Sequence, residues 1–436
     1  MTAAKTDLLP AKMIELQQQI AALLLYQAVL SDPVGQCFLA LLRSLHAAEP
    51  IPCLEAYGRW FHTLAGAQCR WSDHLIQQIL LADNPFSAQA QSRQALPTAL
   101  LAAAKQDLAL LQKLAQCDEI QLSQWVQTIC QLDQPPLVWA GDRPQVLTFL
   151  HTAQDWPAQL PQLIAHYQQA GVGLFAQHRA FGWHGGHLQG IAHPDPIRLA
   201  QLAGYESQKA ILMQNTEFLL AGHPALNVLL YGSRGSGKSS LVKALVNEWY
   251  EGGLRLVEVP KVALSELPQI VDRLRSVPQK FLVFVDDLSF EADDERFKGL
   301  KVVLEGSVTA PAPNVVVYAT SNRRHLIREF FNERPRPRDA DEIHHWDTVQ
   351  EKLSFSDRFG LTLTFEPAGQ DTYLAIVRHL AEQVNLPLAA ETLDFEARQW
   401  AKRHNGRSGR TARQFIDHWQ AQLATPNARK PLDFQA

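Results

Sequence analysis

The chain has 436 residues, of which 46% are hydrophobic, and its 40 basic and 44 acidic side chains give a formal net charge of −4. This length suits two or three domains, each with an apolar core of its own. The near balance of charge excludes a protein that coats nucleic acid by bulk charge, although it leaves room for a local basic patch.

Cysteine usage and the N-terminus indicate where the protein works. All the cysteines lie in the first third of the chain without a CxxC pair, so buried free thiols are expected rather than a disulfide framework or a zinc site. The N-terminus lacks a secretion signal, and apolar runs such as Ile20–Leu25 are too short to span a membrane. We therefore expect a cytoplasmic protein without a membrane span.

Residues 1–178 repeat apolar positions at helical spacing, for example at Met13, Leu16 and Ile20. Proline residues break this segment into successive helices. The sequence therefore predicts a mainly helical N-terminal domain. It carries no motif of known chemistry, and we expect it to hold an unknown protein client.

Residues 179–194 contain a Gly185-Gly186 pair between two short alternating segments. This pattern predicts a β-hairpin, because glycine supplies the positive φ angles of a tight turn, and we interpret the segment as a hairpin linker. His184 and His187 flank the turn without a nearby cysteine or carboxylate, so surface histidines are a better interpretation than metal ligands.

From residue 195 onward, strand and helix patterns alternate. The candidate strands are Asn227–Tyr231, Leu254–Val259, Phe281–Val285, Asn314–Ala319 and Leu361–Phe365. Near-continuous apolar strands are typical of a parallel sheet covered by helices on both faces. We predict an α/β domain over residues 195–368 with a five-stranded parallel sheet, followed by a small helical lid over residues 369–436.

The strand that ends at Tyr231 runs into GSRGSGKS, a complete GxxxxGK[ST] motif between a strand and a helix. Its glycines let backbone N–H groups surround phosphate oxygens, and the helix N-terminus adds partial positive charge. Lys238 is expected to reach the β- and γ-phosphates of ATP, and Ser239 to bind Mg²⁺. The predicted phosphate-binding residues are Gly232, Ser233, Arg234, Gly235, Ser236, Gly237, Lys238, Ser239 and Ser240.

A second motif follows at the spacing of one strand–helix–strand unit. Phe281–Val285 is an apolar strand that ends in Asp286-Asp287. Ligands of open α/β sheets bind at the carboxyl ends of the strands. We expect Asp286 to hold Mg²⁺, and Asp287 to be the carboxylate that activates the attacking water.

With these two motifs in place, the sequence resembles an AAA+ ATPase. Val317–Asn322 resembles the sensor-1 strand, which implies that Asn322, alone or with Thr320, orients the water. The segment around Arg358 resembles the arginine-finger region, which implies that Arg358 reaches the nucleotide of a neighbouring subunit in a homo-oligomer.

The same resemblance extends to the two sides of the nucleotide. Gly409–Phe415 resembles the sensor-2 helix, with Arg413 as the first candidate and Arg410 as the second. The loop at Gly204 and Tyr205 resembles the one that packs on adenine.

More closely, residues 196–419 are similar to a bacterial family known only as domain of unknown function 815. The matching stretches are AGYESQKAILMQNTEFLLAG, LVFVDDLSFE, YATSNRRHLI, EKLSFSDRFGL and GRTARQFIDH. This resemblance implies the AAA+ fold, ATP and magnesium, but no client or pathway.

One departure from the AAA+ pattern concerns the rate of hydrolysis. Asp287 stands where AAA+ motors usually carry glutamate, whose side chain is one methylene longer. A misplacement of about 1 Å can cost roughly 100-fold in rate. Asp287 could therefore act slowly, Glu291 could assist it, or the protein could be a nucleotide-gated switch.

Two further clusters favour ordinary surface loops. Six arginines between Arg323 and Arg338 are partly balanced by acidic neighbours, so a solvated loop is favoured over a nucleic-acid surface. His344 and His345 are adjacent in the chain, and adjacent side chains rarely point at one metal ion.

The sequence thus leaves several functions open. The leading hypothesis is an oligomeric ATPase that remodels or switches a macromolecular partner. A slow, nucleotide-gated adaptor is the second hypothesis, and a nucleic-acid loader is the third. A GTPase is disfavoured because no NKxD motif follows the P-loop, and a metabolic kinase is the weakest option because no acceptor site is visible.

Overall fold

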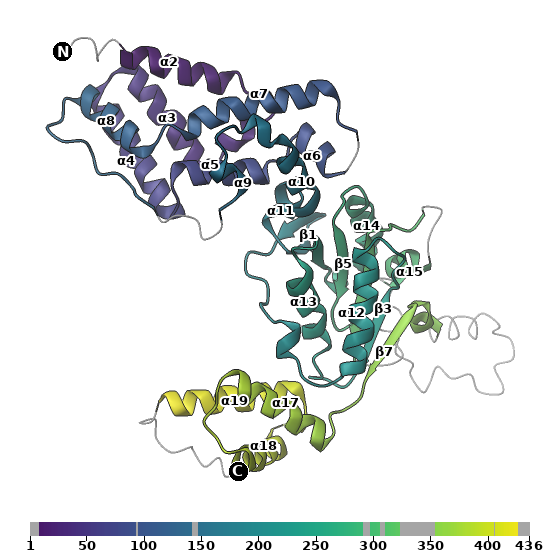
Figure 1. Cartoon of the computed structure of the whole chain (residues 1–436). Coiled ribbons are helices and arrows are strands. Elements are labelled where there is room, and N and C mark those ends of the chain that lie inside the picture. Colours follow the sequence, from purple (N-terminus) through teal and green to yellow (C-terminus); the bar gives the residue numbers. More distant parts are fainter. Residues whose placement is uncertain are drawn as a thin grey trace. The chain divides into compact units, whose positions relative to one another are not determined.

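A computed structural model describes residues 8–92, 95–141, 147–290, 297–305, 310–322, 354–404 and 406–425. The chain divides into two compact units, residues 1–177 and 178–436. Figure 1 shows the helical first unit, and a second unit that combines a sheet with helices.

The first unit is mainly helical, as the periodicity predicts. Phe38, Trp60 and Trp71 are fully or almost fully buried at its centre, where the rings of Phe38 and Trp71 stack with centroids 4.0 Å apart. Its α-helices are α2 (Leu8–Ala21), α3 (Pro33–Ala47), α4 (Pro50–Ala67), α5 (Trp71–Leu81), α6 (Pro85–Gln91), α7 (Thr98–Ala115), α8 (Glu119–Cys130), α9 (Phe149–Thr152), α10 (Leu160–Ala170) and α11 (Gly173–Gln177), with short 3-10 turns at Gln27–Leu30 and Pro157–Gln159.

The cysteines of this unit are free thiols, as expected, although only Cys53 and Cys117 are buried. Burial raises the pKa of each of these two thiols to about 12. Both thiols therefore stay protonated and unreactive near neutral pH.

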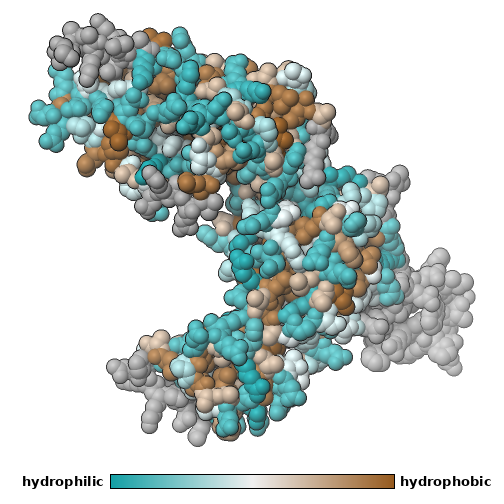
Figure 2. Space-filling view, in the orientation of Figure 1, coloured by the Kyte–Doolittle hydropathy of each residue, from teal (hydrophilic) through white to brown (hydrophobic). Residues whose placement is uncertain are grey.

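Within the described part of the chain, no helix is long and apolar enough to cross a membrane. The face shown in Figure 2 carries hydrophilic side chains over both units, with smaller apolar groups between them.

The second unit is built on a seven-stranded sheet in the order β2-β1-β4-β5-β6-β3-β7. All neighbouring strands are parallel except β1 and β2, which are antiparallel. The strands are β1 (Ala180–His184), β2 (His187–Gly190), β3 (Val228–Gly232), β4 (Leu254–Glu258), β5 (Lys280–Val285), β6 (Val315–Ser321) and β7 (Leu361–Phe365). The prediction of a parallel sheet is confirmed, but its count of five strands was wrong.

The two additional strands are the predicted hairpin, which extends the sheet. Phe181 of β1 lies opposite Val257 of β4 in a parallel pair. Phe181 and Trp183 are buried, and the Trp183 indole donates a hydrogen bond to Glu266 at 2.7 Å. Burial of these aromatic side chains explains why the hairpin belongs to the sheet.

Helices cover both faces of the sheet. On one face, Leu212 of α12 (Glu206–Leu220) and Leu245 of α13 (Lys238–Trp249) share a core with Leu230 and Phe284. Residues that alternate with these along the strands are equally buried on the other face, where α14 (Leu267–Arg275) contacts β6. The helix α15 (Phe297–Glu305) packs beside α14.

The strand order determines where a ligand can bind. The chain leaves β3 through α13 and crosses two strands to reach β4, and it later returns past β3 to form β7. A crevice forms outside the carboxyl ends of the strands where such connections diverge. The carboxyl ends of β3, β5 and β6 lie at this edge.

The described part of the lid consists of three helices, α17 (Gln370–Gln383), α18 (Ala390–Arg403) and α19 (Gly409–Ala424). They have a small core of their own around Tyr373 and Phe415. The His379 ring contacts the carbonyl oxygen of Ala200 at 2.7 Å, which ties α17 to the loop before α12.

Candidate functional site

A cavity of about 630 Å³ lies at the carboxyl edge of the sheet. It is bounded by the glycine-rich loop, the ends of β5 and β6, the segment before α12, and two lid helices. Its lining consists of Ile197, Gln201, Leu202, Ala203, Arg234, Gly235, Ser236, Gly237, Lys238, Ser239, Ser240, Asp286, Asp287, Thr320, Asn322, Ile376, Leu380, Gly409, Arg410, Arg413 and Gln414.

The glycine-rich loop turns sharply between β3 and α13. Gly232, Gly235 and Gly237 have φ angles of +137°, +73° and +90°, which residues with a side chain rarely adopt. A Cβ atom on Gly232 would lie 2.0 Å from the carbonyl oxygen of Phe365. These positions therefore require glycine, and the loop ends with the N-terminus of α13 directed toward the cavity.

Lys238 is the first residue of α13, and its side chain folds back over the loop. Its Nζ donates to the carbonyl oxygens of Gly232 at 3.0 Å and Ser233 at 2.7 Å. Burial lowers the pKa of Lys238, an effect that the nearby Asp286 and Asp287 oppose. Gly232 and Ser233 are thus acceptors for this ammonium group and do not line the cavity.

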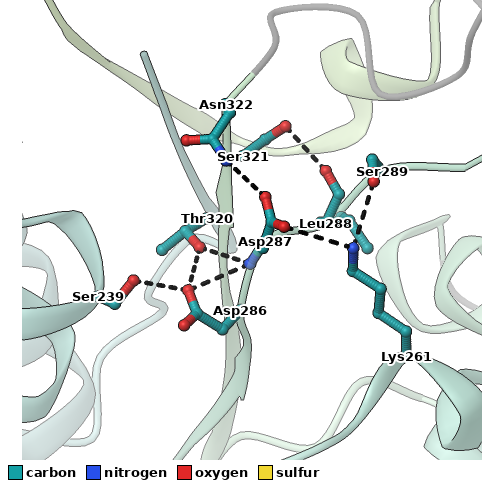
Figure 3. A network of polar contacts seen from close by, with 9 residues as sticks. All are labelled: Ser239, Lys261, Asp286, Asp287, Leu288, Ser289, Thr320, Ser321 and Asn322. Atoms are coloured by element: carbon teal, nitrogen blue, oxygen red, sulfur yellow. Dashed lines mark hydrogen bonds and ion pairs between the residues drawn. The ribbon is translucent and has the colours of Figure 1, made fainter. Parts of the chain in front are cut away.

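Asp286 accepts hydrogen bonds from two hydroxyl groups on different elements (Figure 3). Ser239 Oγ of α13 lies 2.6 Å from Asp286 Oδ1, and Thr320 Oγ1 of β6 lies 2.5 Å from the same oxygen. The network joins the first turn of α13 to the ends of two central strands. It places a hydroxyl and a carboxylate side by side at the cavity wall.

Asp287 has a left-handed backbone with φ +52°. Its N–H donates to Asp286 Oδ1 at 3.1 Å and to Thr320 Oγ1 at 2.8 Å, which holds the strained turn in place. Asn322 Nδ2 donates to Asp287 Oδ1 at 2.6 Å (Figure 3). The two residues predicted to act on water are therefore in direct contact.

The sequence did not identify Lys261 as part of this network. Its Nζ lies 3.9 Å from Asp287 Oδ2 and donates to Ser289 Oγ at 3.2 Å. Lys261 follows β4 and meets Asp287 only because β4 and β5 are neighbours in the sheet. No local sequence pattern could have indicated this contact.

The segment before α12 contributes Gln201, Leu202 and Ala203 to the cavity, whereas Gly204 and Tyr205 lie beside it. The Tyr205 hydroxyl donates to the carbonyl oxygen of Glu366 at 2.6 Å, and its ring packs on Phe365. The residues of this segment that face the cavity thus come just before the two that the sequence resemblance named.

Both predicted lid arginines line the cavity. The backbone N–H of Arg410 donates to the carbonyl oxygen of Gly235 at 3.2 Å, so α19 touches the glycine-rich loop. Arg413 is one helical turn further along and is half-buried, whereas Arg410 is exposed. This difference favours Arg413 as the more firmly positioned cation.

Arg358 does not line the cavity. It ends the short 3-10 helix Ser354–Arg358, and its Nη1 lies 2.6 Å from Glu305 Oε1. Its side chain is only 17% exposed. The structure thus ties Arg358 to α15 of the same chain, outside the site that the sequence motifs share.

Several other residues that the sequence analysis singled out are not described by the structure. Glu291, the arginines from Arg323 to Arg338, and His344 with His345 lie outside the described residues. Among the residues that are described, no group of three His, Cys, Asp or Glu side chains could hold a metal ion, and this covers His184 and His187.

Comparison with solved structures finds matches at low identity. RuvB, a Holliday junction branch migration motor from Thermotoga maritima, is 13% identical, with a TM-score of 0.38 over 54% of this chain and 68% of that one. A single-substitution mutant of the same motor is 15% identical, with a TM-score of 0.38 over 54% and 69% of the two chains. No curated protein matches the chain.

A family model described as "Protein of unknown function (DUF815)" matches residues 176–423, more than half of the chain. The match covers the sheet, the cavity and the lid. The chain therefore belongs to this family, and its second unit has the parallel α/β fold with a glycine-rich P-loop between β3 and α13 that the sequence predicts.

Proposed function

We propose that the second unit binds ATP with Mg²⁺ in the cavity at the carboxyl edge of its sheet. One observation carries this proposal: the glycine-rich loop, Lys238, the Ser239–Asp286 pair and the lid arginines all border the same space. Its volume of about 630 Å³ falls within the range of about 300–1,000 Å³ typical of small-molecule sites.

The triphosphate would lie along the glycine-rich loop at the N-terminus of α13. Backbone N–H groups and the helix dipole favour negative charge there. Lys238 would exchange its two carbonyl acceptors, on Gly232 and Ser233, for oxygens of the β- and γ-phosphates. The contacts that it makes now show that the ammonium group already reaches the bend of the loop.

Ser239 and Asp286 fit a magnesium ion. Mg²⁺ prefers oxygen ligands and is usually held by one or two protein side chains together with substrate phosphates and water. The Ser239 hydroxyl and the Asp286 carboxylate are adjacent, 2.6 Å apart, and both line the cavity. When bound, the metal neutralises charge on the β- and γ-phosphate oxygens.

Asp287 is the carboxylate that we assign to water activation, and Asn322 is the group that orients it. In the present arrangement Asp287 Oδ1 accepts from Asn322, and Oδ2 lies near Lys261. A water molecule must displace or share one of these contacts before Asp287 can accept its proton. This requirement, together with the short aspartate side chain, supports slow hydrolysis.

Slow hydrolysis also supports the second candidate function, a nucleotide-gated adaptor. In this mode the bound nucleotide sets the position of the lid, and the helical first unit holds a protein client.

We propose that the chain works as a cytoplasmic homo-oligomer in which Arg358 completes the site of a neighbouring subunit, once it has left Glu305.

Steady-state ATP turnover of the full chain tests the proposal. We expect Lys238→Ala to abolish turnover by removing nucleotide affinity, and Asp287→Asn to abolish it while affinity remains. Asp287→Asn should then retain a client when ATP is present, which affinity capture followed by mass spectrometry would identify. Unchanged turnover in both variants would contradict the assignment, and turnover well above one per second would exclude the slow adaptor.

A further inference from the structure

The lid contains a second cavity, of about 600 Å³, that shares no lining residue with the nucleotide site. It lies between α18, the segment that leads from β7 into α17, and the loop before α19. Pro367, Ala368 and Ala401 form its apolar part. Nothing in the proposed ATP mechanism uses this cavity.

The charged residues that line the lid cavity are all cationic. Arg398, Lys402 and Arg407 border it, and its lining contains no carboxylate. Arg398 lies 3.7 Å from Asp394, but this carboxylate is also bound by Arg378, so one negative charge serves two guanidinium groups. The cavity therefore carries a net positive charge.

The Arg407 guanidinium has only a neutral partner among the contacts of the described residues. Its Nη2 donates to Oε1 of Gln370, which also lines the cavity, at 3.2 Å. An amide oxygen leaves the positive charge uncompensated, so an anionic ligand could replace or join it.

An aromatic ring stands beside these cations. Phe395 lines the cavity, and 56% of its surface is exposed, although large apolar side chains are usually buried. Phe395, Arg398 and Lys402 follow one another at intervals of three and four residues, so they share one face of α18. Gln399 of the same helix adds a hydrogen-bonding amide to this face.

We propose that this lid cavity binds single-stranded nucleic acid, with one base stacked on Phe395 and neighbouring phosphates held by Arg398, Lys402 and Arg407. An exposed aromatic platform within a cationic groove is the arrangement by which proteins bind single strands without strict sequence preference. The amides of Gln370 and Gln399 offer contacts to the edges of the stacked base. An acidic peptide would use the cations but would gain little from the ring.

Fluorescence anisotropy with the full chain tests this assignment. The probe is a labelled thymidine oligonucleotide of about 15 nucleotides, a length at the upper end of known single-strand site sizes. We expect binding that weakens as salt rises from about 50 mM to about 200 mM. Phe395→Ala should weaken it by about tenfold, because one stacking platform is lost, whereas Phe395→Trp should retain it.

The structure also provides matched controls. Arg403 is the exposed neighbour of Lys402 on α18 but does not line the cavity. Lys402→Gln should therefore weaken oligonucleotide binding several-fold, while Arg403→Gln, with the same loss of charge, should change it less than twofold. Lys238→Ala should bind the oligonucleotide as well as the unmodified chain does, which separates this site from the proposed nucleotide site.

Four results would overturn the proposal. The first is the absence of binding to both the thymidine oligonucleotide and a uridine oligonucleotide at the lower salt concentration. The second is an equal effect of Lys402→Gln and Arg403→Gln, and the third is full binding by Phe395→Ala. Competition by poly-glutamate as strong as that by unlabelled oligonucleotide would assign the cavity to acidic protein segments instead.

Discussion

The backbone at Asp287 allows structural strain and chemistry to be separated by substitution. A residue with a Cβ atom in the left-handed region costs about 1–2 kcal/mol relative to an ordinary conformation, whereas glycine adopts it freely and aspartate and asparagine tolerate it best. Asp287 has φ +52° at the end of the buried strand β5. This backbone gives a physical reason for aspartate in place of the longer glutamate.

The side-chain contacts of Asp287 contribute little to stability. Its side chain is 61% exposed and lies 3.9 Å from Lys261. An exposed ion pair is worth only about 0–1 kcal/mol, and the Asn322 hydrogen bond about 1 kcal/mol. Asp287→Asn keeps an acceptor for Asn322 and tolerates the same backbone, so its stability should remain within about 0.5 kcal/mol of the original.

Alanine and glycine isolate the backbone term, because both lack the side-chain contacts. We expect Asp287→Ala to be about 1 kcal/mol less stable than Asp287→Gly, a difference of about 2–4 °C in Tm for a unit of this size. All three variants should lose turnover by about 10²–10⁴-fold, the usual contribution of a general base.

Thermal unfolding by circular dichroism and steady-state ATP turnover measure the two effects on the same samples. Asp287→Ala that is at least as stable as Asp287→Gly would refute the argument from backbone strain. Full turnover in Asp287→Asn would refute the assignment of the carboxylate to water activation, whatever the stabilities.

The remaining predictions concern Arg358, the two lid arginines and Lys238. Arg358→Ala should lower ATP turnover at protein concentrations that allow assembly. Glu305→Gln breaks the same ion pair but keeps the arginine, so it should not lower turnover. Equal effects of both substitutions would reduce Arg358 to a structural role. Arg413→Ala should weaken ATP binding by about 10–100-fold, which corresponds to the loss of one hydrogen bond to a charged group. Arg410→Ala should weaken ATP binding less, because Arg410 is the more exposed of the two. The reverse order in a calorimetric titration would exchange their roles. Burial lowers the pKa of Lys238 below 10.5. The charged form of Lys238 binds phosphate, so ATP affinity should be constant at pH values below that lowered pKa and should fall above it. A constant ATP affinity up to pH 10.5 would contradict the role of the ammonium group.

Much of the fold follows from local sequence patterns. The five predicted strands agree with β3 to β7 to within one or two residues at each end, because each is an apolar run between turn residues. The hairpin was predicted as well, but its parallel pairing with β4 was not. That pairing joins Phe181 to Val257, which lie far apart in the chain, and depends on tertiary burial of Trp183.

The residues of the candidate site also fall into two groups, those that sequence motifs indicate and those that only the tertiary arrangement places. Lys238, Ser239 and Asp286 belong to motifs whose spacing and flanking elements indicate their chemistry, and the structure brings them together. Lys261 reaches the site only because of the strand order, and Leu202 faces the cavity only because of the path of a loop. Such positions depend on tertiary arrangement, which periodicity and motifs do not encode.

Direct titration with ATP tests the central claim, because the phosphate and metal assignments both depend on binding at Lys238. Isothermal calorimetry of the full chain should show ATP affinity that requires Mg²⁺, falls on addition of a chelator, and is lost in Lys238→Ala while the thermal unfolding curve is unchanged. A correctly folded chain that shows no magnesium-dependent affinity for ATP or ADP would contradict the account.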